Sequence, residues 1–130
     1  MTPLQPRKSG RSKPKRRRTR LAHRKRAWGY LVMWEFKVRA GTEKRFEKVY
    51  GSDGEWVRFV RQNDSYIKTE LVHAPEAGRT HVTLDYWTSQ EAYEAFRKQH
   101  AAKYKALDQR CQGMTESERE IGRFVRVASE

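Results

Sequence analysis

All fifteen aromatic residues of the chain lie at or after Trp28, whereas residues 1–26 carry twelve Lys or Arg and neither Asp nor Glu. The formal net charge of +13 is therefore concentrated in this leading segment, because the remaining 17 basic and 16 acidic side chains nearly cancel. A segment with so few apolar side chains cannot offset the entropy cost of becoming ordered. We therefore expect a disordered basic arm over residues 1–27 and one folded domain over residues 28–130, a length that suits a single domain.

The basic arm carries enough charge to bind nucleic-acid phosphates, but it has no aromatic side chain on which a base could stack. Three interpretations stay open. The arm binds polyanions adventitiously, or it results from an upstream translation start that adds residues to the working protein, or it is a genuine nucleic-acid tether. The candidate phosphate-binding residues are Lys13, Lys15, Arg16, Arg17, Arg18 and Arg20.

The sequence shows no membrane, metal or nucleotide signal. No apolar run approaches the roughly 18 residues that a membrane-spanning helix needs. The four histidines are isolated, and Cys111 is the single cysteine, which fits a reducing compartment. Phosphate-binding glycine loops and paired metal-ligand spacings are also missing. We therefore expect a cytoplasmic protein that binds neither a membrane nor a metal and that uses no cofactor.

The first half of the domain reads as a strand followed by a divided helix. Apolar residues alternate along Trp28–Val38, and both faces are partly apolar, which is typical of a central strand. Gly41 ends this strand, and Thr42 is positioned to cap a helix that runs to Tyr50. The segment Gly51-Ser52-Asp53-Gly54 interrupts the helix, and Ser52 with Glu55 resembles a capping box for a second one.

The second half predicts two strands, one long helix and a last strand. The strands are expected at Tyr66–His73 and Thr80–Trp87, and the last one at Glu120–Val127. Thr88 and Glu91 form a further capping box that opens the long helix. Its apolar stripe consists of Tyr93, Phe96, His100, Tyr104 and Leu107, whereas the residues expected to face water are Glu94, Arg97, Lys98 and Lys105.

The order of these elements, βα(α)ββαβ, predicts an α+β domain of the ferredoxin-like type, βαββαβ with a split first helix. Helices can cover only one face of such a sheet. The opposite face carries Leu31 and Met33, so we expect a second copy of the chain to cover it and form a homodimer. Glu35 lies on this same face, where pairing with Lys or Arg is the expected role.

Two segments resemble the antibiotic-biosynthesis-monooxygenase type of dimeric α/β barrel. They are Val38-Arg39-Ala40-Gly41-Thr42-Glu43 with Phe46, and Trp87-Thr88-Ser89-Gln90-Glu91-Ala92. The resemblance implies a cleft between sheet and helices, in which some members oxidise polycyclic aromatic substrates with dioxygen and without metal or flavin. A haem-degrading branch places Asn at the position of Trp34 and His near Ala106, a pattern that this chain does not carry.

The candidate site is a set of aromatic side chains from the first strand and the helices. They either fill the core or line a pocket for a flat, small aromatic molecule. His100 is either a boundary histidine or the base that removes a phenolic proton. We expect an oxygenase, or a binder, for a small aromatic or quinol-type molecule; the alternative is a non-catalytic barrel that the arm tethers to nucleic acid. The candidate substrate-binding residues are Trp34, Phe36, Trp56, Phe59, Tyr93, Phe96 and Tyr104.

Overall fold

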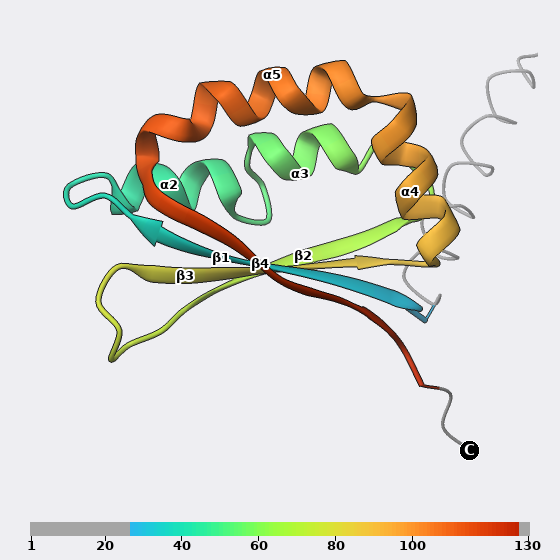
Figure 1. The fold of residues 1–130 in the computed structure, drawn as a ribbon, viewed down its shortest axis with the longest axis horizontal. Coiled ribbons are helices and arrows are strands. Elements are labelled where there is room, and N and C mark those ends of the chain that lie inside the picture. The colour runs from blue at the N-terminus through green and yellow to red at the C-terminus, as the bar shows by residue number, and fades with distance from the viewer. Residues whose placement is uncertain (1–26, 128–130) are drawn as a thin grey trace, which may run out of the picture.

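The computed structural model describes residues 27–127 (Figure 1). The predicted basic arm, with the six candidate phosphate-binding residues from Lys13 to Arg20, lies outside the described residues, so the nucleic-acid tether stays a prediction. In chain order the elements are β1 (Tyr30–Val38), α2 (Glu43–Tyr50), α3 (Glu55–Val60), β2 (Tyr66–His73), β3 (Thr80–Trp87), α4 (Gln90–Gln99), α5 (Ala101–Cys111), the short 3₁₀ turn η1 (Gln112–Met114) and β4 (Thr115–Val125).

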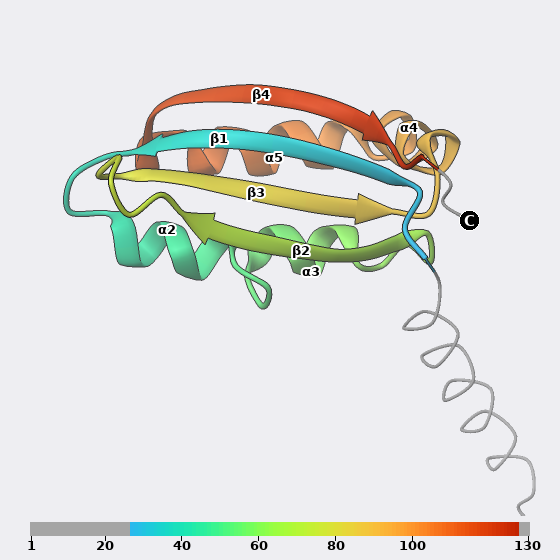
Figure 2. The ribbon, with the colours of Figure 1, turned by 90° about the horizontal axis from the view of Figure 1, so that it is seen from below.

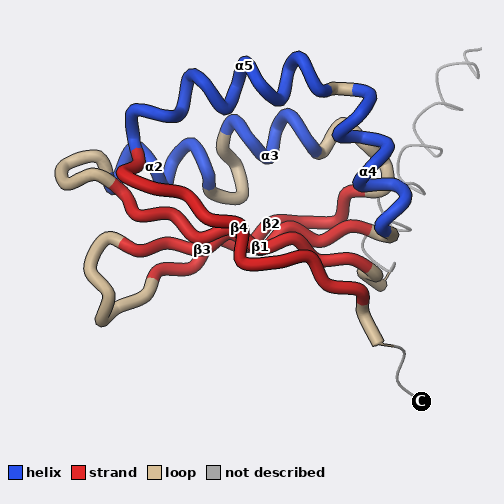
Figure 3. Tube along the Cα trace, viewed as in Figure 1, coloured by secondary structure: helices blue, strands red, loops and turns tan. Residues whose placement is uncertain are grey.

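The four strands form one antiparallel sheet in the order β2-β3-β1-β4, which Figure 2 shows face on. The two central strands are β1 and β3, and the partly apolar faces of β1 predict its central position. All helices within residues 27–127 lie against one face of the sheet, so the domain has two layers (Figure 3). This arrangement confirms the ferredoxin-like α+β fold with a split first helix.

Alternation along β1 explains why this strand lies at the centre of the sheet. Tyr30, Val32, Phe36 and Val38 are buried and point toward the helices, whereas the residues between them are half-buried or exposed. Gly41 has a φ of +85°, a left-handed conformation that turns the chain from β1 toward α2. Apolar periodicity and turn chemistry therefore agree in this part of the chain.

The helix starts differ from the predicted capping boxes. The N-cap of α3 is Gly54 rather than Ser52. The N-cap of α4 is Ser89, whose hydroxyl accepts a hydrogen bond from the Ala92 backbone N–H at 3.1 Å, so Thr88 does not cap this helix. Serine and threonine are both good N-caps, and spacing alone does not separate neighbouring candidates.

The predicted long helix is broken at His100, which has φ −115° and ψ 29° and separates α4 from α5. Figures 1 and 2 show α4 rising at one end of the sheet and α5 running back from it along the helix-covered side, beside α2 and α3. A straight helix of this length would extend away from the sheet, so the bend keeps α5 over the core. Neither Gly nor Pro stands at the break, and the local sequence therefore contains no signal for it.

The last strand begins at Thr115, five residues before the predicted start at Glu120. Its first half carries acidic side chains that obscure the alternation, although Thr115 itself is buried. The core consists of two clusters of buried residues, and Trp34 and Phe59 pack against both. One cluster includes Trp87 and Phe96, and the other includes Phe36 and Phe46.

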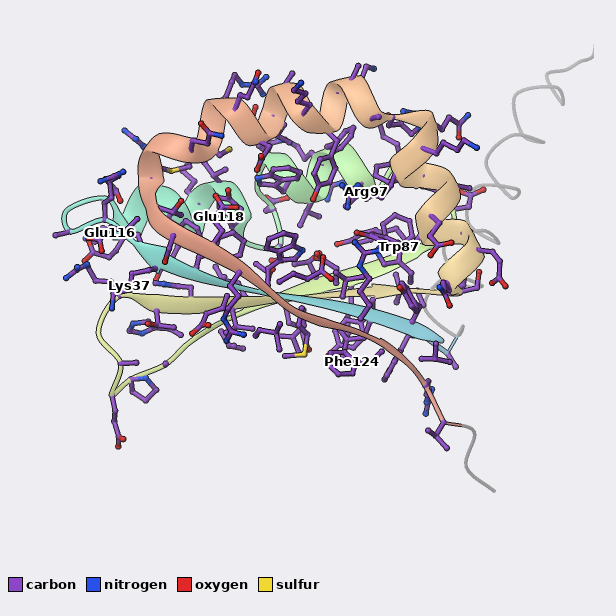
Figure 4. All side chains as sticks on the ribbon, viewed as in Figure 1. Lys37, Trp87, Arg97, Glu116, Glu118 and Phe124 are labelled. Atoms are coloured by element: carbon purple, nitrogen blue, oxygen red, sulfur yellow. The ribbon has the colours of Figure 1, made fainter. Side chains whose placement is uncertain are left out.

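The face of the sheet that the helices leave open is partly apolar. Leu31 and Met33 of β1 are half-buried, and Val72 and Phe124 on the edge strands are exposed. Figure 4 shows Phe124 on the side of the sheet opposite the helices. The homodimer that this face predicts stays a prediction. Within residues 27–127, no helix has the length and apolar character that crossing a membrane requires.

Candidate functional site

A cavity of about 270 Å³ lies between the helix-covered face of the sheet and the helices. Its walls combine apolar rings with a small number of polar side chains, which is the composition of ligand-binding pockets. Six of the seven predicted aromatic residues line it: Trp34, Phe36, Trp56, Tyr93, Phe96 and Tyr104. The core beneath the helices is therefore not completely filled.

Two of the predicted site residues are not among those that line the cavity. Phe59 packs its ring against Phe96, with 5.2 Å between ring centroids, and against Tyr104. His100, at the break between the helices, packs against Phe96 at 4.9 Å and against Phe59 at 6.2 Å. The base role of His100 stays a prediction, and the cavity geometry favours a different residue.

That residue is Asp85 on β3, which points to the helix side of the sheet and lines the cavity. The Asp85 side chain is half-buried. The surface that it leaves accessible faces the cavity, and protein atoms surround the rest of the side chain. Burial raises the pKa of Asp85 to about 6, because the charged carboxylate loses water. A hydrogen bond of 2.6 Å from the Thr69 hydroxyl opposes this effect by stabilising the charged form.

A β-bulge brings Thr69 to Asp85. Tyr66 pairs with Trp87, but the next pair joins Lys68 to Tyr86, so Ile67 is an extra residue in β2. Without it, Tyr66 and Thr69 would point to opposite faces of the sheet; with it, they share the face that carries Asp85. The Tyr66 and Thr69 hydroxyl oxygens are 2.7 Å apart. Since Thr69 donates to Asp85, Tyr66 donates to Thr69, which forms a chain of hydrogen bonds leading to the cavity.

Arg97 of α4 also lines the cavity. The sequence predicts that it faces water, and this prediction is wrong. One guanidinium nitrogen donates a 2.8 Å hydrogen bond to the Tyr93 hydroxyl, and the guanidinium carbon lies 3.9 Å from the centre of the Tyr104 ring. The guanidinium thus stacks on an aromatic face within the site. The other three residues predicted to face water, Glu94, Lys98 and Lys105, are exposed.

Two further carboxyl groups line the cavity. Asp108 of α5 and Glu118 of β4 both line it. Burial raises the pKa of Glu118, and the negative charge of Asp108 raises it further, whereas a 3.2 Å hydrogen bond from Thr115 lowers it. Figure 4 shows Glu118 and Arg97 between the helices and the sheet, well apart from each other. The cavity wall therefore carries one cation and, well apart from it, the carboxyl group of Glu118.

Outside the cavity, the strongest polar arrangement involves His81 of β3. His81 is buried, its Nε2 lies 2.8 Å from a Glu47 carboxylate oxygen, and its ring lies 4.6 Å from the His73 ring. In the part of the chain that the structure describes, no three His, Cys, Asp or Glu side chains come together as metal ligands.

From the sequence alone, no role is assigned to Asp85, and Arg97 is placed outside the site. The sequence nevertheless contains patterns that place both residues on the face of the cavity. Alternation along β3 puts Asp85 on the same face as Trp87, so a carboxylate on a buried face could have been noticed. Arg97 stands four residues after Tyr93 and seven before Tyr104, which is helical spacing for a shared face. Glu118 gave no such signal, because its strand was predicted to begin after it.

Comparisons with known proteins now identify the family. The family model described as Antibiotic biosynthesis monooxygenase matches residues 29–106, which is more than half of the chain. The chain belongs to this family. The match covers β1 through about the first half of α5, so the resemblance that the sequence segments indicate is confirmed. A search of curated protein sequences finds no match.

Solved structures show the same fold. SnoaB, a cofactor-independent oxygenase from Streptomyces nogalater, is 16% identical with a TM-score of 0.62, and the match covers 79% of this chain and 97% of SnoaB. PA3566 from Pseudomonas aeruginosa is 10% identical with a TM-score of 0.56, covering 79% and 98% of the two chains. SO0527 from Shewanella oneidensis is 15% identical with a TM-score of 0.56, covering 76% and 91%. At such identities the likeness establishes the family fold alone.

Proposed function

We propose that this family member is a cofactor-independent oxygenase that acts on a small aromatic, quinol-type molecule bound in the cavity. The observation that carries the proposal is Asp85, a carboxylate with a pKa raised to about 6 inside an aromatic-walled cavity. A base with a pKa close to neutral is still ionised at pH 7 and is stronger than an ordinary aspartate. Its neighbours Trp34, Phe96 and Tyr104 offer flat apolar surface to an aromatic ring.

Asp85 would remove the hydroxyl proton of the substrate. The resulting phenolate or enolate is rich in electrons, and its carbon gives one electron to dioxygen. The two radicals then join as a carbon-bound peroxide, which takes the proton back from Asp85. In the hydroxyl tautomer of an anthrone-type substrate, the carbon that is CH₂ in the keto form carries one hydrogen, so loss of water from its hydroperoxide leaves C=O at that carbon. One oxygen atom of dioxygen enters the product and the other leaves as water, so no external reductant is needed.

The structural likeness to SnoaB supports this proposal, since SnoaB is described as a cofactor-independent oxygenase. The two chains share the fold at low identity, so the likeness supports the class of reaction only. The substrate class is inferred from the residues that line the cavity. The predicted absence of a cofactor agrees with the proposed chemistry, in which the substrate itself supplies every electron.

Oxygen uptake tests the role of Asp85. Wild type, Asp85→Asn and His100→Ala are supplied with anthrone in an oxygen electrode. We expect Asp85→Asn to lower the turnover by about 10²–10⁴-fold, the usual contribution of a positioned base. His100→Ala serves as the matched control and should turn over like wild type. Undiminished turnover in Asp85→Asn would show that Asp85 is not the base. Loss of turnover in His100→Ala alone would identify His100 as the base.

We also propose that the protein is a homodimer in which the open faces of two sheets meet. This proposal is supported by the half-buried Leu31 and Met33 and by the exposed Phe124 on that face. Sedimentation velocity at micromolar concentration should give a dimer for wild type and a monomer for Met33→Lys, which would place a charge at the interface. A wild-type monomer at that concentration would exclude the pairing.

A further inference from the structure

We propose that Arg97 is a binding subsite for an anionic oxygen of the ligand, so that the substrates are hydroxyaryl carboxylates. The inference rests on the proposed function only in taking the cavity as the ligand site. Two observations carry it: the guanidinium is held in a fixed orientation inside the cavity, and within residues 27–127 no carboxylate is paired with it.

The orientation of Arg97 is determined by two contacts with α4 and α5. The hydrogen bond to the Tyr93 hydroxyl uses one terminal nitrogen, and the stack on the Tyr104 ring fixes the plane of the group. A guanidinium has five N–H donors, and most of them remain for a ligand after this single hydrogen bond. An arginine held in this way loses little further freedom when it binds, which favours affinity.

Asp85 does not act as the missing partner of Arg97. A guanidinium paired with this carboxylate would lower the pKa of Asp85. Burial instead raises the pKa of Asp85, and the hydrogen bond from Thr69 is what opposes the rise. Among the ion pairs and hydrogen bonds of residues 27–127, none joins Asp85 to Arg97, although both charges act on Tyr104. One can receive the hydroxyl of a ligand while the other receives an anionic group.

A half-buried guanidinium without an anion carries a desolvation cost that a bound carboxylate would offset. Its planar fork of donors matches the two oxygens of a carboxylate, whereas a neutral phenol or ketone oxygen can use only part of it. Glu118, which lies well apart from Arg97, would repel an anion at its end of the cavity. The charges thus favour one orientation, with the carboxylate at Arg97 and the apolar rings around the aromatic system.

Equilibrium binding tests the subsite without any turnover. Tryptophan fluorescence quenching at pH 7.5 compares 6-hydroxy-2-naphthoic acid with 6-hydroxy-2-naphthamide, which has nearly the same shape and no charge. We expect wild type to bind the acid at least about ten times more tightly than the amide, because hydrogen bonds to charged groups are the stronger ones. Equal affinities for the two probes would overturn the proposal.

Variants test whether the preference for the acid over the amide depends on Arg97. Arg97→Met should weaken binding of the acid by about 10–100-fold and change binding of the amide little. Lys98→Met removes the same charge from the next, exposed residue and is the matched control, which should bind both probes like wild type. Arg97→Gln keeps a donor for Tyr93, and it replaces Arg97→Met if the latter does not fold by circular dichroism. A preference for the acid that survives in the folded variant would overturn the proposal.

The outcome is independent of the oxygenase test. Asp85→Asn should keep the preference for the acid, since its side chain is not the anion subsite. If Asp85→Asn turns over normally while Arg97→Met loses the preference, the base assignment fails and the subsite stands. If the acid and the amide bind equally while Asp85→Asn is inactive, the subsite fails and the oxygenase stands.

Discussion

Charged side chains have different surroundings on the two faces of the sheet. On the face that the helices cover, Asp85 receives a hydrogen bond from Thr69 and borders a cavity, and its pKa is raised to about 6 because burial penalises the charge. On the open face, Glu35 accepts from Arg119 at 2.6 Å, and 66% of the Arg119 side chain is exposed. Both carboxylates lie on central strands with comparable alternation. The two side chains are both carboxylates, so the difference comes from their surroundings: burial penalises the charge of Asp85, whereas Glu35 forms an ion pair that water still reaches.

The largest expected contrast between the faces concerns apolar packing. Phe46 is completely buried and stacks on Tyr50 with 4.2 Å between ring centroids, whereas Phe124 on the open face is 43% exposed. We expect Phe46→Ala to lower the free energy of unfolding by about 3–5 kcal/mol, because it leaves a cavity in the core. Phe124→Ala should cost less than about 1 kcal/mol in the monomer. Urea denaturation measures both, and similar costs would contradict the assignment of a covered and an open face.

The next contrast is the pH dependence that Asp85 confers on stability. Its pKa is about 6 in the folded chain and near the ordinary value of 3.8 when unfolded. The folded state therefore binds the proton more tightly, and the stabilisation is fully present below pH 4 and is lost as the pH rises through 6. The loss amounts to at most about 3 kcal/mol.

Urea denaturation between pH 4 and pH 8 measures this loss as a difference between wild type and Asp85→Asn. The free energy of unfolding of wild type should fall relative to the variant over that interval. Because all other titrating groups are common to both proteins, they cancel in the difference. A constant difference across the interval would show that Asp85 is not held in a dehydrated environment.

A smaller effect concerns the hydrogen bond that tunes Asp85. Thr69→Val removes the donor and should raise the pKa of Asp85 by about one unit, since a hydrogen bond to a charged group is worth about 1.5–3 kcal/mol. The rate of oxygen uptake depends on the ionised carboxylate, so its pH profile should shift upward by the same amount. Thr69→Ser retains a hydroxyl and should restore the profile of wild type. A lower rate with an unshifted profile would indicate that Thr69 supports only the structure.

Local patterns predict the first three strands of this fold well because burial and alternation act on neighbouring residues, whereas the acidic start of β4 is missed. The central positions of β1 and β3 follow from their apolar content, and β2 and β3 have the predicted bounds. The break at His100 and the bulge at Ile67 could not be predicted, because each satisfies packing between distant segments rather than a local preference. The same distinction applies to the residues of the site. Its aromatic walls follow from helical periodicity, whereas the hydrogen bond from Thr69 to Asp85 depends on the bulge.

The smallest expected effect belongs to the open face. Glu35 and Arg119 form two hydrogen bonds, at 2.6 and 3.1 Å, between neighbouring strands. An exposed ion pair gains little, because water solvates both charges before folding and salt screens them afterwards. A double-mutant cycle of Glu35→Gln and Arg119→Gln should therefore give a coupling free energy below about 1 kcal/mol that decreases with added salt.

The same cycle also reports on the proposed dimer. If a second sheet covers the open face, the pair loses water, and its coupling should exceed the monomer value and resist salt. Measuring the cycle in Met33→Lys, the variant expected to be monomeric, separates the two states. A coupling that is weak and salt-sensitive in both backgrounds would mean that Glu35 and Arg119 remain in water whether or not two chains associate, so that the sheets meet elsewhere on this face or not at all.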